Sequence, residues 1–447
     1  MMVRVRFGLL ALACSMGLHA MNKAYVSNRG VSPNTVSVID TDTATVIGTV
    51  ADQVPATFGI INVMAISPDG RTVYGANDGV PGSISVINTI TNMVTGLVTD
   101  LPIPSFNTTM DLAFTPNGLK AYAVNYGDTI DPTTSTVAVI NTATNTATRL
   151  VDATSEPFNG SYYIAMAFDG SKAYVSNSAS NTVSVIDIAT DTVERGIPGF
   201  TSPNPVAVTS DGKTLYVGNN AGAASTIGIV DLATDTITYV ADLLPPTFND
   251  PYALVISPDG KTLYVNNWNA GNNTLSIVDI AQQRVTDVVT YSPASQIVYM
   301  ALTPNGKTLY APSPGFPSPV PAGSVSLLDV PSKAITDPVT DLATPTFNGP
   351  FALAMPRHTQ PWGSTASDVF LTQIDHINVI AWNVPIGGLA PVEYRVYRNA
   401  ALTDLAGTAL ITKFADHNRI MGTSYTYYVA SVGSSGLLSV LGSVTVA

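Results

Sequence analysis

Short runs of alternating apolar and polar residues recur along the chain at a nearly constant interval. One unit reads as the run VMAIS at 63–67, a PDG turn, the run RTVYGAN, a Gly/Asn loop, the run SISVIN, a T-x-T turn and a last run MVTGLV. Alternation with a period of two is typical of strands that bury one face, and the Gly-, Pro- and Asn-rich segments are typical of turns. The pattern predicts four strands in each unit of about 48 residues.

Two markers count the units independently. A tyrosine recurs in the second run, at Tyr25, Tyr74, Tyr122, Tyr174, Tyr216, Tyr264 and Tyr310. An Asp or Asn closes the third run in phase with it, at Asp40, Asn88, Asn141, Asp187, Asp231, Asp279 and Asp329. Four strands at this period, in units that cannot bury both faces alone, are typical of propeller blades. The sequence predicts an all-β fold, a seven-bladed β-propeller.

The two ends of the repeat predict how the ring closes. The first unit starts at Lys23 and lacks an innermost strand, whereas the unclaimed run 349–355 (GPFALAM) resembles the inner strand of the other units. Because exposed sheet edges are normally avoided, we expect strand 350–355 to pair with the strand containing Tyr25. The propeller then spans residues 22–357.

The repeat also carries a family resemblance. YVSN at 25–28, YGAN, YAVN, a second YVSN, YVGN and YVNNWN, with SPDGRTVY, SPDGKTLYV and SVIDIATDTV, resemble the signature of YVTN-type β-propeller repeat proteins of bacterial and archaeal surfaces and periplasms. The resemblance covers roughly three quarters of the chain. It implies a seven-bladed propeller but no single activity, because one fold hosts many functions. The seventh unit departs from the pattern at Tyr310-Ala311-Pro312-Ser313.

The N-terminus predicts export. Arg4 and Arg6 precede the apolar run 7–16, and Ala20 provides a small residue for cleavage, so residues 1–20 read as a secretory signal peptide. The run is about half of the roughly 20 residues that a membrane helix needs, and we expect no transmembrane segment. Cys14 is either an ordinary residue of this run or a lipid-anchor site. We expect the protein to be secreted, periplasmic or on the cell surface.

The chain changes character after residue 357. Residues 358–367 are polar, contain Pro361 and Gly363, and read as a linker. Residues 368–447 alternate in five further runs and predict a small β-sandwich without disulfides. Trp382, the EYRVYRN run and SYTYYVASVGSSG resemble a fibronectin type III module, with Tyr425 or Tyr427 near the tyrosine corner. Such modules serve as spacers or adhesive units.

Composition and charge narrow the partners. The 447 residues are 45% hydrophobic and 11% charged, with Lys+Arg 19 against Asp+Glu 31 and a formal net charge of −12. Nucleic-acid binding draws on clustered basic residues, so DNA and RNA partners are not expected.

Candidate chemistry is sparse. The four histidines are His19, His358, His376 and His417, so the propeller span contains none. Zinc sites, His-based acid–base catalysis and Ser-His-Asp triads need imidazole. No EF-hand, GxxxxGK or HExxH motif occurs. We therefore expect no cofactor and no metal. Calcium at Asp78, Asp128 and Asp131 is the weaker alternative, because their spacing matches no ligand pattern.

Several repeated residues have a structural explanation. In six units an Asn follows the repeated Tyr by three residues, as in Asn28 and Asn77, and is expected to hold the next loop. Asp40 and its equivalents are expected to cap the T-x-T turns. A T-F-N-like motif precedes the inner strands, with Phe58, Phe106, Phe158, Phe248 and Phe347. These rings either plug the gaps between blades or form an aromatic ring for glycans or peptides.

The candidate ligand-binding residues are Asp111, Tyr163, Tyr299, Trp268 and Phe316. Trp268 lies in NNWNAGNN and Phe316 in the long loop of the seventh unit. Alignment on the PDG-like turns places Asp111 level with the uncharged residues Val63, Tyr163, Pro205, Ala253 and Tyr299. An unpaired buried carboxylate is costly, so Asp111 either contacts a ligand or ion at the channel mouth or is bonded to neighbouring backbone N–H groups.

The sequence favours a secreted or cell-surface protein with a binding or scaffold role. We expect a propeller face to contact an extracellular protein or glycan, and we do not expect enzymatic activity. The competing class is an extracellular hydrolase or lyase, similar to the propeller lactonases, which would use at least two converging carboxylates at the channel mouth. A third class is a structural subunit of a surface coat, which would show no pocket.

Overall fold

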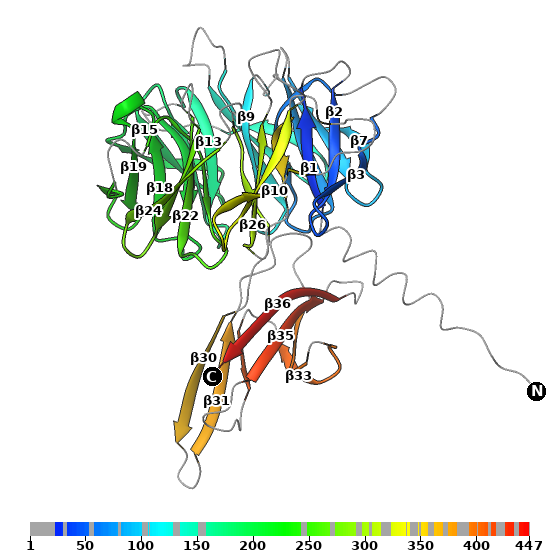
Figure 1. The fold of residues 1–447 in the computed structure, drawn as a ribbon. Helices are drawn as coiled ribbons and strands as arrows, with labels where there is room; N and C mark the ends of the chain where they lie inside the picture. Colours follow the sequence, from blue (N-terminus) through cyan, green and yellow to red (C-terminus); the bar gives the residue numbers. More distant parts are fainter. Residues whose placement is uncertain are drawn as a thin grey trace, which may run out of the picture.

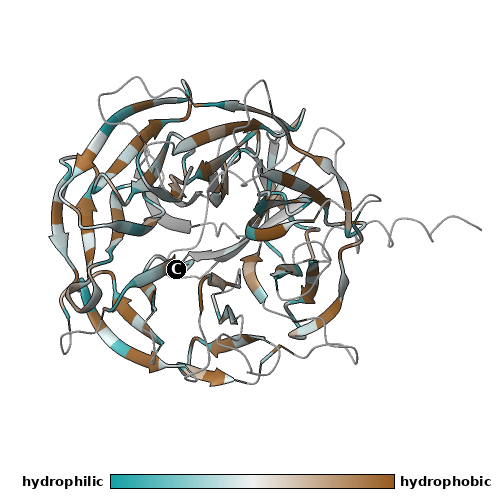
Figure 2. Cartoon of the chain, turned by 90° about the horizontal axis from the view of Figure 1, so that it is seen from above, coloured by the Kyte–Doolittle hydropathy of each residue, from teal (hydrophilic) through white to brown (hydrophobic). Residues whose placement is uncertain are grey.

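The computed structural model describes residues 23–29, 34–52, 58–78, 82–100, 106, 108–127, 135–150, 158–242, 248–268, 273–291, 297–303, 306–313, 323–336, 338–339, 347, 350–355, 362–369, 374–381, 393–399, 401–409, 413–416, 425–432 and 438–446. The expected signal peptide 1–20 with Cys14, and also Phe316 and Trp382, lie outside these residues. The described chain is all-β, with seven sheets arranged as a ring and two further sheets after them (Figures 1 and 2). The predicted fold class is confirmed.

Each blade is built from strands that run outward from the ring axis in the order inner, second, third and outer. The inner strands of blades 1 to 7 are β29 (Pro350–Ala354), β4 (Ile60–Ile66), β9 (Thr109–Phe114), β13 (Ser161–Met166), β17 (Pro203–Val208), β21 (Pro251–Ile256) and β25 (Ala301–Leu302). The second strands are β1 (Lys23–Asn28), β5 (Thr72–Asp78), β10 (Lys120–Asn125), β14 (Lys172–Asn177), β18 (Thr214–Asn219), β22 (Thr262–Asn267) and β26 (Thr308–Ser313).

The outer half of each blade follows the same order. The third strands are β2 (Thr35–Asp40), β6 (Ser83–Asn88), β11 (Thr136–Asn141), β15 (Thr182–Asp187), β19 (Thr226–Asp231), β23 (Thr274–Asp279) and β27 (Ser324–Asp329). The outer strands are β3 (Thr45–Thr49), β7 (Met93–Leu97), β12 (Thr146–Arg149), β16 (Thr192–Pro198), β20 (Thr236–Tyr239), β24 (Arg284–Thr290) and β28 (Ala334–Thr336). A short 3₁₀ turn, η2 (Gly222–Ala224), lies in blade 5.

The ring closes as the sequence predicts. Strand β29 pairs antiparallel with β1, with Tyr25 opposite Ala354 and Val26 opposite Leu353. Blade 1 therefore combines its inner strand from residues 350–354 with three strands from residues 23–49. Without β29 the inner edge of β1 would have unpaired backbone groups.

The core lies between neighbouring blades. One apolar cluster joins Tyr25, Val38 and Ala352 of blade 1 to Ile61 and Val73 of blade 2. The repeated tyrosines are buried, and in six blades the residue opposite each on the inner strand is alanine: Ala354, Ala65, Ala113, Ala165, Ala207 and Ala301. A small residue beside each large ring keeps the packing dense without strain.

The phenylalanines of the T-F-N-like motif plug the blade interfaces. Phe58 (9% exposed), Phe106 (2%) and Phe158 (4%) are buried within the clusters that join successive blades. The interpretation as blade plugs is confirmed, and these rings are not available to a ligand.

Repeated polar residues hold the turns. The side-chain amide of Asn77 donates to the hydroxyls of Ser83 and Ser85 at 3.0 and 2.9 Å, and its oxygen accepts from the backbone of Gly59. Asp40 accepts from the backbone N–H groups of Asp42 and Thr43. Both groups serve the fold, as expected, by satisfying loop backbone and side-chain partners.

Chain segments that leave some outer strands cover the edge of the next blade. β8 (Thr99–Asp100), directly after blade 2, runs parallel to the outer strand β12 of blade 3. Ala51 forms a similar parallel bridge to Met93, and Ala241 to Arg284. These contacts occupy backbone groups that an outer edge would otherwise expose.

The C-terminal region forms a three-stranded sheet and a four-stranded sheet. The first has the order β30 (Trp362–Val369), β31 (Ile374–Ala381) and β34 (Lys413–Asp416). The second has the order β33 (Leu405–Ala409), β32 (Glu393–Tyr397), β35 (Tyr425–Val432) and β36 (Leu438–Val446), with Tyr427 fully buried. Strand β30 corrects the expected linker 358–367, because residues 362–367 pair with β31 instead of forming a connection.

Candidate binding site at the ring axis

Residues from five blades meet near the ring axis, at the end where the inner strands begin. We call Arg29, Asp111, Tyr126, Tyr162, Tyr163, Tyr252, Trp268, Tyr299 and Phe351 the axial cluster. They come from the first residues of inner strands, from the segment before β25, and from the residues that follow the repeated Asn of the second strands. Strands that radiate from one axis bring equivalent ends together, which is why residues so distant in sequence share a site.

Asp111 lies on the inner strand of blade 3, opposite Val124, next to a shift in register between β9 and β10. Its carboxylate accepts a hydrogen bond from the backbone N–H of Leu112 and another from that of Ile164 in blade 4, each at 2.9 Å. The backbone-bonded alternative describes this geometry, because an acceptor-only carboxylate satisfies two N–H donors of neighbouring inner strands. Asp111 therefore links blades 3 and 4.

Tyr299 bridges two non-adjacent blades. It belongs to the segment before β25 in blade 7, and its phenol hydroxyl donates to the backbone carbonyl of Met110 in blade 3 at 3.1 Å. Burial raises the pKa of Tyr299 well above its usual value, and the negative charge of Asp111 raises it further. The ring therefore stays neutral and acts as a hydrogen-bond donor near the axis.

Tyr163 lies close to the same carboxylate. Burial raises its pKa, and the neighbouring Tyr299, Tyr252 and Asp111 add to the shift. The structure thus brings Asp111, Tyr163 and Tyr299 together, which the sequence alignment of the inner strands suggests.

Trp268 also belongs to this cluster. Its side chain is 38% exposed, and its ring contacts that of Tyr252 edge to face, with centroids 5.0 Å apart. Phe316, the fifth residue selected from the sequence, lies outside the described residues.

The aromatic side chains form a continuous row across three blades. The centroid distances are 5.1 Å for Tyr126–Tyr162, 6.4 Å for Tyr162–Tyr163, 6.4 Å for Tyr163–Tyr252 and 5.0 Å for Tyr252–Trp268. We call these five residues the aromatic row. Within the described part of the chain, none of its four phenol hydroxyls has a hydrogen-bond partner. Amphipathic rings with unused hydroxyls can offer both an apolar face and a polar edge to a ligand.

Arg29 is the residue that sequence reasoning misses. Its guanidinium carbon lies 3.9 Å from the ring centroid of Phe351, and Phe351 contacts Tyr299 at 5.8 Å. Burial lowers the pKa of Arg29, while Asp78, Tyr299 and Tyr252 oppose that shift. A signal in the sequence could have indicated it. Arg29, Tyr126 and Trp268 each come directly after a repeated Asn, so they occupy equivalent positions in their blades.

The acids Asp111 and Asp78 lie near this end of the ring and differ in setting. Asp111 is partly buried and bonded to backbone, whereas Asp78 is exposed at the end of β5. Within the ranges that the structure describes, no group of three His, Cys, Asp or Glu side chains could hold a metal ion.

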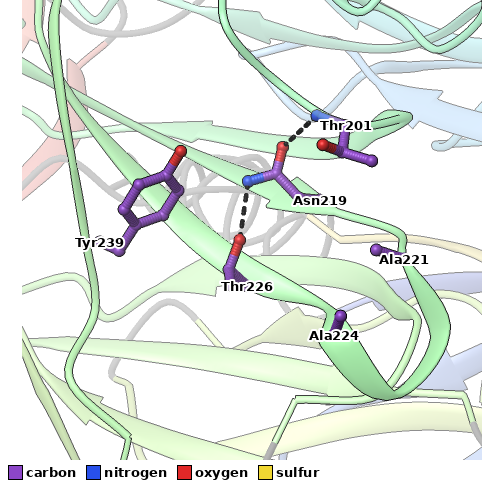
Figure 3. Close-up of a pocket in the computed structure, with 6 residues that line it drawn as sticks. All are labelled: Thr201, Asn219, Ala221, Ala224, Thr226 and Tyr239. Carbon is purple, nitrogen blue, oxygen red and sulfur yellow. Dashed lines mark hydrogen bonds between the residues drawn. The ribbon is translucent and has the colours of Figure 1, made fainter.

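A separate pocket lies in blade 5, where Thr201, Asn219, Ala221, Ala224, Thr226 and Tyr239 line it (Figure 3). The amide of Asn219 donates to Thr226 Oγ1 at 3.0 Å and accepts from the backbone of Thr201 at 3.1 Å (Figure 3). Its polar groups already serve the blade, so the axial cluster is the stronger candidate for a binding site.

The known proteins that this chain resembles are also seven-bladed β-propellers. A family model described as lactonase, seven-bladed β-propeller, matches residues 136–302. A segment of 113 residues is 34% identical to the seven-bladed β-propeller protein Rv1057 of Mycobacterium tuberculosis. The matched segment covers 25% of this chain and 28% of the length of that protein.

Two solved structures have the same overall arrangement. A functionally unknown protein from Desulfotomaculum acetoxidans matches with a TM-score of 0.56 and 19% identity over 75% of this chain and 99% of that one. Dihydro-heme d1 dehydrogenase NirN in complex with DHE matches with a TM-score of 0.51 and 13% identity over 75% of each chain. Together with the family match, these similarities show that the chain is built on a seven-bladed β-propeller.

Proposed function

We propose that the protein is a binding protein that acts outside the cytoplasm and uses the axial cluster to hold an extracellular protein or glycan. The observation that carries this proposal is the aromatic row, whose phenol hydroxyls have no hydrogen-bond partner in the described ranges. By contrast, the phenols of Tyr25 and Tyr74 in the blade interfaces donate to Asn92 and Asn145. Hydroxyls that the fold leaves unused at an accessible end of a rigid ring are suited to a ligand.

Rigidity supports the same proposal. Tyr162 and Tyr163 lie in the register shift between the paired residues Ser161 and Ile164. Tyr252 lies in a similar shift, between the paired residues Pro251 and Ala253. Sites carried by such elements lose little conformational entropy when a ligand binds.

The extracellular location rests on the sequence. Residues 1–20 have the features of a signal peptide, and the repeat resembles the YVTN-type surface proteins. The C-terminal sheet orders β30-β31-β34 and β33-β32-β35-β36 support a fibronectin type III-like module that spaces or attaches the propeller. The described part of the chain contains no helix with the length and apolarity that a membrane crossing requires.

The family match to lactonases supports a second candidate, an extracellular hydrolase or lyase. Such an enzyme would need a carboxylate that can accept a proton at the axis. Both oxygens of Asp111 already accept backbone hydrogen bonds, which argues for the binding role.

An array of glycans and peptides, probed with the mature protein, tests the proposal. We expect retention of a restricted set of ligands, competed by the same ligand in solution. The same preparation is assayed for hydrolysis of a panel of lactones. No retained ligand, together with lactone turnover that Asp111→Ala abolishes, would replace the binding role with the enzymatic one.

Export has its own measurement. N-terminal sequencing of the protein from the producing cell should give Met21 as the first residue after signal cleavage. A lipid-modified Cys14 at the new N-terminus would instead identify an anchored protein.

A further inference from the structure

The guanidinium of Arg29 has an unusual environment for a partly buried cation. Among the described residues it has no hydrogen-bond or ion-pair partner. The ring of Phe351 covers it, and the charge of Asp78 acts on it without a direct ion pair. Arg195, in contrast, forms a two-point ion pair with Asp235, at 2.8 and 2.9 Å. An arginine carries five N–H donors, and leaving them unused in a partly desolvated place costs free energy unless a ligand engages them.

The stacking on Phe351 orients this cation for an anion. An aromatic ring can cover the face of a guanidinium while its N–H groups remain on the rim, where they match the two oxygens of a carboxylate. Arg29 also lies within electrostatic reach of Tyr252 and Tyr299, so the cation and the aromatic row belong to one site.

The charge of the whole chain limits the size of that anion. The protein has a formal net charge of −12, and the axial cluster contains one cation, Arg29, and one carboxylate, Asp111. Over distances shorter than the Debye length, about 10 Å at 0.1 M salt, the surrounding negative charge disfavours a polyanion. A single carboxylate gains the local contact and avoids most of that repulsion.

The aromatic row indicates what carries the carboxylate. Trp268 is partly exposed and contacts Tyr252 edge to face, and the hydroxyls of Tyr126 and Tyr162 have no hydrogen-bond partner among the described residues. A sugar ring has an apolar C–H face for stacking and hydroxyls along its rim, so it can use both features of the row at once.

We propose that the axial cluster binds a saccharide that carries one carboxylate, a uronic-acid sugar, with Arg29 holding the carboxylate and the aromatic row contacting the sugar rings. This inference deepens the proposed binding function and rests on it. It assigns Arg29 and Phe351 to recognition, and neither residue is selected by the repeat pattern.

The test uses two disaccharides that differ in one group. Cellobiouronic acid, with one carboxylate, is compared with neutral cellobiose by calorimetry on the purified full chain. Two charge-assisted hydrogen bonds from Arg29 to the carboxylate should give the acid an affinity about tenfold higher than that of cellobiose, or more. Arg29→Gln should lower the affinity for the acid to that for the neutral sugar. Arg29→Lys should keep part of the preference for the acid. Arg71→Gln, an exposed residue of a PDG turn, makes the same charge change away from the cluster and should preserve the preference.

A second measurement keeps the result independent of folding. The thermal unfolding midpoint of Arg29→Gln should stay close to that of the parent, because the residue makes no hydrogen bond within the described structure. Quenching of tryptophan fluorescence by the acid, absent in Trp268→Phe, should place the sugar beside the aromatic row.

The possible outcomes distinguish failure of this inference from failure of the proposed binding function. Equal affinities for the acid and the neutral sugar would overturn the role of Arg29 but leave a glycan-binding protein. If the protein binds a tripeptide with a free C-terminal carboxylate and neither sugar, the inference that the ligand is a saccharide is wrong. Failure of every glycan and peptide on the array would overturn both.

Discussion

The phenol hydroxyl of Tyr310 donates a hydrogen bond to the backbone carbonyl of Thr41, at 3.2 Å. Tyr310 lies in blade 7 and Thr41 in blade 1, so this bond crosses the closure of the ring. Equivalent bonds join Tyr25 to Asn92 and Tyr74 to Asn145 in successive blades. The repeated tyrosine therefore has two roles, since its ring fills a blade interface and its hydroxyl attaches to a turn of the next blade.

Tyr310→Phe should weaken the ring closure. The substitution keeps the buried ring and removes one hydrogen bond, so the free energy of unfolding should fall by about 1 kcal/mol. Denaturant unfolding followed by circular dichroism measures it. Tyr239→Phe, on an exposed ring in β20, is the control and should change the free energy of unfolding by less than about 0.5 kcal/mol. Equal effects of the two substitutions would contradict the role of the Tyr310–Thr41 bond.

The buried tyrosines predict alkaline unfolding. Burial raises the pKa of Tyr74, Tyr216 and Tyr310 to about 12, above the usual phenol value of 10.0 that an unfolded chain would show. Above pH 10 the unfolded state therefore binds fewer protons than the folded state, and stability falls as the pH rises towards 12. Tyrosinate absorbance and loss of circular dichroism should appear in one cooperative step. Tyrosinate formation with the fold intact would show that these phenols are accessible to solvent.

Asp111→Asn separates a structural role from a ligand role. The amide keeps only one acceptor oxygen for the N–H groups of Leu112 and Ile164, so the free energy of unfolding should fall by about 1–3 kcal/mol. Thermal unfolding and ligand affinity are measured on the same variant. Lower stability with unchanged affinity would assign Asp111 to the fold alone, whereas lost affinity with unchanged stability would assign it to the ligand.

Trp268→Ala tests the aromatic row. Because the side chain is 38% exposed and contacts mainly Tyr252, its loss should lower ligand affinity about tenfold while costing about 1 kcal/mol or less of stability. Tyr239→Ala removes an exposed ring of the outer strand β20 and should leave affinity unchanged. If both variants bind as the parent does, the ligand does not use the row.

A truncation after residue 360 tests whether the propeller folds alone. The seven blades are complete by Ala354, and no described strand from β30 to β36 pairs with a blade strand. The shortened chain should unfold cooperatively in calorimetry. A broad, non-cooperative transition would show that the C-terminal sheets are needed for the stability of the ring.

Much of the fold could be predicted from local pattern. The in-phase Tyr and Asp/Asn markers count seven blades, and the missing inner strand at Lys23 and the surplus strand at 350–355 predict closure. These signals are readable because each strand alternates with a period of two and each turn needs particular residues. The C-terminal domain is predicted to start at residue 368, but β30 begins at Trp362, because a Ser-, Thr- and Gly-containing segment can still pair when a neighbouring strand is supplied.

The candidate site could be predicted only in part. Aligned inner strands single out Asp111 with Tyr163 and Tyr299, because a charge among apolar equivalents is visible in a repeat. Arg29 could not be selected in this way. It lies next to Asn28 in the sequence, and nothing local indicates that Phe351 will be beneath it.

The sequence by itself determined the all-β class, the seven blades and the closing strand, because these depend on periodicity and turn chemistry along short segments. Only the tertiary structure decided that Arg29, Tyr252 and Phe351 lie near one another, that Tyr299 bridges blades 7 and 3, and that the carboxylate of Asp111 is bonded to the next blade. The physical reason is that a ring places residues from non-adjacent blades around one axis, so contacts there depend on blade geometry and side-chain reach, which sequence spacing does not encode.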